Sequence, residues 1–124
     1  MTTENLSKAR KISSWVVVGL LAALFLMSSG SKLTGSQEMV TNFEKWGLSG
    51  WLTIVGIGEL VSAILYLIPR TSSLGVLLLS AHMGGAIVTH LCHGEPFVFQ
   101  AVILVLVWVG NYLRNPEMLA SFTK

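Results

Sequence analysis

The feature that most constrains this chain is Glu59, a carboxylic acid in the middle of the apolar run 52–68. At about 1.5 Å per residue, a helix over this run is roughly 26 Å long, close to the hydrocarbon thickness of a bilayer. Glu59 then lies near the membrane midplane, where an ionisable group costs about 2.5 to 3.5 kcal/mol on insertion scales. Such a group is usually turned inward and paired, so we expect Glu59 to face other polar side chains inside a helical bundle.

The composition favours a membrane protein over a water-soluble one. Of the 124 residues, 52% are hydrophobic and only 11% are charged, which is too little polar surface to cover the chain in water. The formal net charge of +2 is small, and its distribution does not predict nucleic-acid binding. The single cysteine, Cys92, cannot form an internal disulfide, and no CxxC pair is present.

Apolar segments of helical length use most of the chain. We place four of them at about residues 12–33, 51–68, 74–92 and 96–113. Pro69 and Arg70 end the second segment, and Pro96 suits the first turn of the fourth. The segments are continuously apolar, unlike the alternating strands of a membrane barrel. We therefore predict an all-α fold, an integral membrane four-helix bundle that forms a single transmembrane domain over residues 1–124.

Lysine and arginine residues set the expected orientation. Lys32 and Lys45 lie on one side of the bundle, and the other six lie on the opposite side: Lys8, Arg10, Lys11, Arg70, Arg114 and Lys124. By the positive-inside rule, we expect both termini in the cytoplasm. The first apolar segment is longer than that of a typical signal peptide, so we expect it to be retained. The connection 34–50 mixes apolar and polar residues with helical spacing, which predicts a short amphipathic helix at the outer interface.

The polar residues inside the segments can be assigned a depth. Glu59 and His82 lie near the centres of the second and third segments, so they reach similar heights and are expected partners. The sequence leaves open whether they pair as an acid with a neutral histidine or as a carboxylate with an imidazolium. Further polar groups lie toward the outer side, which predicts a pocket that opens outward and is closed by apolar packing on the cytoplasmic half. The candidate ligand-binding or proton-handling residues are Glu59, His82, His90, Lys32, Ser28 and Gln100.

Several of these residues also have a structural interpretation. Glu59 can serve as a hydrogen-bonding group between helices, and Lys32, with its long stem near a segment end, is expected to extend toward the lipid headgroups. Close helix packing is expected at the glycines Gly56, Gly58, Gly84 and Gly85. His90 and His93 lie three residues apart, but this spacing falls short of a complete ligand set, so we predict no metal site.

Short motifs follow one another along the chain. They are 25–33 (FLMSSGSKL), 56–60 (GIGEL), 68–70 (IPR) and 82–86 (HMGGA). In this order they resemble the DoxX-like family of small four-helix bacterial membrane proteins, over about residues 16–114. Lys32 and Glu59 match the family pattern. The resemblance implies a multi-pass protein of the bacterial plasma (inner) membrane, and some relatives are subunits of quinol-oxidising or thiosulfate-oxidising complexes.

Two functions from different classes remain open. The first is a small membrane subunit or accessory factor of a quinone-linked redox or respiratory assembly, which needs partner subunits as well as the lipid bilayer. The second is a self-sufficient binder or transporter of a small lipophilic molecule such as a quinone, active alone or as a homo-oligomer, which needs a cavity. No hydrolase, phosphate-binding or dinucleotide-binding signature is present, so we expect no complete enzyme in this chain and no required cofactor.

Overall fold

The computed structural model describes residues 7–120, which fold almost entirely into helices. The long helices are α1 (Lys8–Leu33), α3 (Leu52–Leu67), α4 (Ser72–Cys92) and α5 (Val98–Arg114), and the short helix α2 (Gln37–Lys45) connects α1 to α3. Single 3-10 turns lie at Ser49–Trp51, Pro69–Thr71 and Pro116–Leu119. No strand occurs between residues 7 and 120, so the predicted all-α fold is confirmed there. With their adjoining turns, α1, α3 and α4 are long and apolar enough to cross a membrane, and α5 is apolar but shorter.

The start of α5 differs from the expectation for Pro96. The helix begins at Val98, so the prediction that Pro96 occupies its first turn is wrong. The chain first has to leave α4 through a Schellman motif, in which Gly94 adopts a φ of 66° and the backbone N–H of Glu95 donates to the carbonyl oxygen of His90 at 2.9 Å. Pro96 follows this cap directly and lies in the connection, where a proline commonly stands after a helix end.

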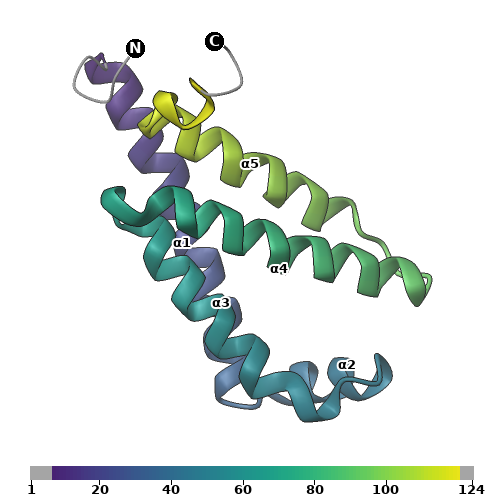
Figure 1. Cartoon of the computed structure of the whole chain (residues 1–124). Helices are drawn as coiled ribbons and strands as arrows, with labels where there is room; N and C mark the ends of the chain where they lie inside the picture. Colours follow the sequence, from purple (N-terminus) through teal and green to yellow (C-terminus); the bar gives the residue numbers. More distant parts are fainter. Residues whose placement is uncertain (1–6, 121–124) are drawn as a thin grey trace.

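The four long helices form two pairs that diverge from one end of the molecule. Helix α1 packs against α3 and α5, and α4 packs against the same two helices. Figure 1 shows that the α1–α3 and α4–α5 pairs meet where α1 begins and α5 ends. They separate toward the opposite end, where α2 lies. We call these the joined end and the open end.

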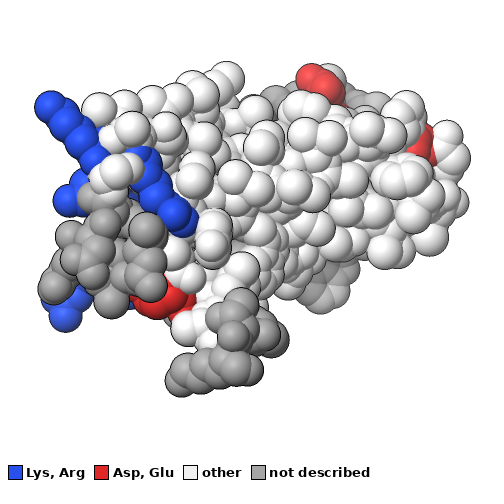
Figure 2. Space-filling model, turned by 90° about the horizontal axis from the view of Figure 1, so that it is seen from above, with Lys and Arg blue, Asp and Glu red and all other residues white. Residues whose placement is uncertain are grey.

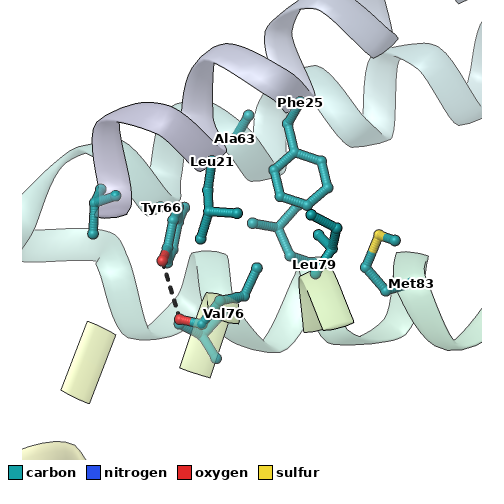
Figure 3. Packing of buried hydrophobic residues seen from close by; sticks show 10 residues of the cluster. Leu21, Phe25, Ala63, Tyr66, Val76, Leu79 and Met83 are labelled. Atoms are coloured by element: carbon teal, nitrogen blue, oxygen red, sulfur yellow. Dashed lines mark hydrogen bonds between the residues drawn. The ribbon is translucent and has the colours of Figure 1, made fainter. Parts of the chain in front are cut away.

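Close contact at the joined end depends on Gly75 and Gly110. A Cβ atom added at Gly75 would lie 2.4 Å from the backbone nitrogen of Tyr66, and one added at Gly110 would lie 2.5 Å from the Tyr66 hydroxyl oxygen. Tyr66 is fully buried, and its hydroxyl donates to the carbonyl oxygen of Val107 at 3.0 Å (Figure 3). Glycine at these two positions therefore allows α4 and α5 to approach α3.

The glycines expected to mediate close packing behave differently from one another. Gly56 mediates close packing as expected, because an added Cβ would lie 3.0 Å from the Cβ of Lys32. The expectation is wrong for Gly58, Gly84 and Gly85, where an added Cβ would meet nothing within 4 Å. Spacing alone does not reveal which side of a helix faces a neighbour, and Gly85 borders a cavity instead.

An apolar core fills the space where the helix pairs meet. Figure 3 shows side chains from α1, α3 and α4 converging in it, and α5 contributes Ile103 and Val107. The buried members are Val18, Leu21, Phe25, Ala63, Tyr66, Val76, Leu79, Met83, Ile103 and Val107. This packing closes one half of the bundle, and that this half faces the cytoplasm stays a prediction.

Lysine and arginine side chains gather near the joined end, on the left of Figure 2. Two of these residues bind helix ends: the Arg114 guanidinium donates to the carbonyl oxygen of Leu67 at 2.9 Å, and that of Arg10 donates to the carbonyl oxygen of Leu113 at 3.0 Å. The last carbonyl groups of a helix lack partners within it, so these cations stabilise the ends of α3 and α5. Lys124, which the sequence assigns to the same side, lies outside the described residues.

Gly75→Ala should lower the thermal stability of the purified protein, because the new Cβ has to push α3 away from α4. Overpacking of this kind typically costs about 1 to 3 kcal/mol. Gly84→Ala is the matched control on the same helix, since its Cβ meets nothing within 4 Å, and it should not lower the melting temperature in detergent. Equal melting temperatures for the two variants would contradict the close contact at Gly75.

Candidate functional site

A cavity of about 670 Å³ lies between the diverging helix pairs. All five α-helices contribute to its wall, and most of the lining side chains are apolar. Its volume lies within the range of about 300 to 1,000 Å³ that is usual for small-molecule sites. The six candidate residues from the sequence all line it: Ser28, Lys32, Glu59, His82, His90 and Gln100. That these residues bind a ligand or handle protons stays a prediction.

Three ionisable side chains meet deep in this cavity. Lys32 Nζ lies 2.9 Å from Glu59 Oε1, and His82 Nε2 lies 3.0 Å from Glu59 Oε2, so the predicted contact between Glu59 and His82 is present. Lys32 also donates to Ser28 Oγ at 2.7 Å. Only 2% of Glu59 is exposed, and a buried carboxylate of this kind needs such partners to offset its desolvation. We call these residues the Lys32–Glu59–His82 cluster.

Lys32 does not extend toward the headgroup region, so that expectation is wrong. Only 8% of the residue is exposed, and its side chain runs along α3 toward Glu59. Gly56 makes this path available, because its missing side chain leaves room for the stem of Lys32. Gly56 and Glu59 are three residues apart and share one face of α3. This glycine-to-glutamate spacing was the signal in the sequence that could have identified the ion pair.

On the open side of the cavity, α2 is attached to the turn between α4 and α5. Trp46 Nε1 donates to Glu95 Oε1 at 3.0 Å, and Lys45 forms an ion pair with the other oxygen of Glu95. The rings of Trp46 and His90 lie with their centroids 5.2 Å apart. His90 Nδ1 lies 2.7 Å from the carbonyl oxygen of Ala86. A carbonyl oxygen can only accept a hydrogen bond, so Nδ1 carries a proton. The other ring nitrogen, Nε2, lies 3.8 Å from Glu95 Oε1. These contacts hold α2 against the cavity.

Sequence reasoning missed Glu95 and the part that Trp46 plays in the cavity. The two residues are 49 positions apart in the chain, and neither lies within a predicted span that would give it a depth. Their pairing depends on how far the helix pairs diverge, which no local pattern encodes. Met39, Asn42 and Phe43 of α2 line the cavity for the same reason.

The electrostatic surroundings of Glu95 favour its ionised form. Hydrogen bonding from Lys45, assisted by the hydrogen bond from Trp46 and the positive charge of Lys45, holds the pKa of the Glu95 carboxyl below its usual value. The attachment of α2 therefore rests on a carboxylate that stays charged at neutral pH.

These features define a class of protein, a small helical membrane protein with a buried ion-paired cluster at a ligand-sized cavity. The family model of the DoxX-like family matches residues 16–110, so the chain belongs to the DoxX-like family and the resemblance of its motifs is confirmed. The comparison with curated proteins and the comparison with solved structures gave no significant match. Apolar helices and family together make the chain a multi-pass membrane protein.

Lys32→Met should destabilise the fold by about 3 to 5 kcal/mol, because it leaves the carboxylate of Glu59 buried without its cation. The double variant Lys32→Met/Glu59→Gln removes both charges and should recover most of this loss. Reversible unfolding in mixed detergent, followed by circular dichroism, measures both effects. A double variant as unstable as the single one would show that the two charges do not stabilise each other.

Lowering the pH should loosen α2. A carboxyl group whose pKa is depressed in the folded protein contributes stability above its unfolded pKa and loses it as the pH falls through the folded value. Amide hydrogen exchange should therefore report lower protection of α2 below about pH 4. Helix α2 also carries two carboxylic acids of its own, Glu38 and Glu44, so Glu95→Gln is the comparison that isolates Glu95. The same pH dependence in this variant and in the original protein would refute the role of Glu95.

Proposed function

We propose that the protein is a four-span protein of the bacterial inner membrane that binds a small lipophilic molecule with a polar head group, such as a quinone. The observation that carries this proposal is the Lys32–Glu59–His82 cluster at a largely apolar cavity. Apolar walls suit the body of such a molecule, and the cluster offers hydrogen bonds to its head group. Apolar side chains of the wall include Leu24, Phe25, Met39, Phe43, Val55 and Ile103.

The polar cluster lets the cavity favour molecules with a polar head group over lipid tails, which apolar walls alone cannot do. Lipid tails are as apolar as leucine side chains, so a lipophile in the bilayer gains little from apolar walls alone. A hydrogen bond to a charged group, in contrast, contributes about 1.5 to 3 kcal/mol. A molecule with a polar head group is therefore favoured over an ordinary lipid tail in this cavity.

The proposed orientation places the cavity away from the cytoplasm. Helix α5 has 17 residues and is about 26 Å long, enough to cross the hydrocarbon layer as the fourth span. Lys8, Lys11 and Arg70 stand at the ends of the spans that meet at the joined end, and the positive-inside rule favours this end in the cytoplasm together with both termini. The open end then faces the outer side.

A role within a larger assembly is the second candidate, and the relatives that are subunits of quinol-oxidising or thiosulfate-oxidising complexes suggest it. A chain of 124 residues that only binds a quinone can serve a redox or respiratory complex as a small subunit or accessory factor. The two candidates are compatible, because the same cavity can hold a molecule that a partner subunit oxidises or reduces. Stable co-purification with dehydrogenase or cytochrome subunits would support this second candidate.

Filling the cavity should abolish the binding of the lipophile. Gly85 borders the cavity and has open space where a side chain would be, so Gly85→Leu should exclude the bound molecule. Gly84→Leu is the matched control, since Gly84 is not part of the lining and also has open space around it. After purification in mild detergent, mass spectrometry of the organic extract should find the lipophile with the original protein and with Gly84→Leu only. Equal retention by Gly85→Leu would refute binding in this cavity.

A further inference from the structure

The hydrogen-bond donors of Lys32 show what kind of atom the cavity can accept. An ammonium group has three N–H donors and no acceptor. Ser28 Oγ takes one at 2.7 Å and Glu59 Oε1 takes another at 2.9 Å. The third has no partner within residues 7–120, and Lys32 lines the cavity. A ligand atom that meets this group therefore has to be a hydrogen-bond acceptor.

Glu59 is already engaged by two partners. Its Oε1 faces Lys32 and its Oε2 faces His82 at 3.0 Å. Because Glu59 is almost completely buried, its carboxylate offers little accessible surface to a hydroxyl or ammonium group of a ligand. The cluster thus presents the free donor of Lys32 to the cavity.

The charge of the cluster argues against an ionised ligand. The positive charge of Lys32 and the negative charge of Glu59 compensate each other at 2.9 Å. A carboxylate or phosphate group placed beside them would leave an extra buried charge, which is costly in a medium of low dielectric constant. An uncharged oxygen acceptor beside the Lys32–Glu59 pair adds no buried charge.

Gln100 provides a second polar point in the same cavity. Its Oε1 atom is buried and has no hydrogen-bond partner within residues 7–120. Turning the amide over places the NH2 group there, so Gln100 can offer a donor or an acceptor at this position. A buried polar atom without a partner costs free energy, and a second polar atom on the ligand would relieve this cost.

From these contacts we infer that the bound molecule is an uncharged lipophile whose head group offers a carbonyl oxygen to Lys32, with a second oxygen within reach of Gln100. A quinone has this chemistry, whereas a fatty acid is an anion at neutral pH and a phospholipid has an ionised phosphate in its head group. The inference rests on the proposed function and specifies which ligands the proposed cavity selects.

The test compares three probes of similar size in lipid nanodiscs: a benzoquinone with one isoprene unit, an alkylbenzene and dodecanoic acid. At pH 7, the quinone should bind at least about tenfold more tightly than either of the others, as expected for one charge-assisted hydrogen bond. In Lys32→Met/Glu59→Gln, the affinity for the quinone should fall about tenfold, while that for the alkylbenzene stays unchanged. Gly84→Leu serves as the control variant with both affinities retained.

A second measurement uses only the original protein and therefore does not depend on whether Lys32→Met/Glu59→Gln folds. The infrared carbonyl band of the 13C-labelled quinone should shift to lower frequency when the molecule is bound to the original protein, because its oxygen accepts from an ammonium group. A bound quinone with an unshifted band would overturn the inference.

The remaining outcomes separate the inference from the proposed function. Equal affinities for the quinone and the alkylbenzene, or tighter binding of dodecanoic acid with uptake of a proton, would overturn the carbonyl preference but leave a lipophile-binding cavity. Failure of all three probes to bind would overturn the proposed function together with the inference.

Discussion

The ion pair between Lys32 and Glu59 is the interaction on which the rest of the structure depends. A carboxylate near the middle of a membrane-spanning helix has no water to solvate it, so a cation from a neighbouring helix has to compensate it. Lys32 does so from α1, and His82 adds a contact from α4. The pairing of charges thereby connects three helices at one depth. It also leaves polar atoms facing the space between them.

The cavity exists because the helices are in close contact at one end only. At the joined end, Gly75 and Gly110 allow the backbones and the Tyr66 ring to approach closely, and the apolar core excludes other molecules. Toward the open end, the α4–α5 pair has separated from α1 and α3, and α2 covers part of the space through the contacts of Trp46 and Lys45 with Glu95. A bundle with close contacts along its full length would have no room for a ligand.

The sequence predicts depth along a helix well and rotation about its axis poorly. The depth of Glu59 and His82 follows from their positions in apolar runs, and this was enough to predict their contact. Whether Lys32 turns toward α3 or toward the headgroups depends on the room that Gly56 leaves, which involves a second helix. The packing roles assigned to Gly84 and Gly85 failed for the same reason. The contacts of Glu95 with α2 join distant segments and depend on the divergence of the helix pairs.

The most direct test of this account is a density map, at a resolution that shows side chains, of the protein purified from its own membrane in lipid nanodiscs. We expect Lys32, Glu59 and His82 to meet as an ion-paired cluster, and we expect elongated non-protein density in the cavity with its polar end at Lys32. Lys32 extended toward the headgroups, or helices α3 and α4 in contact along their full length with no space between them, would contradict it.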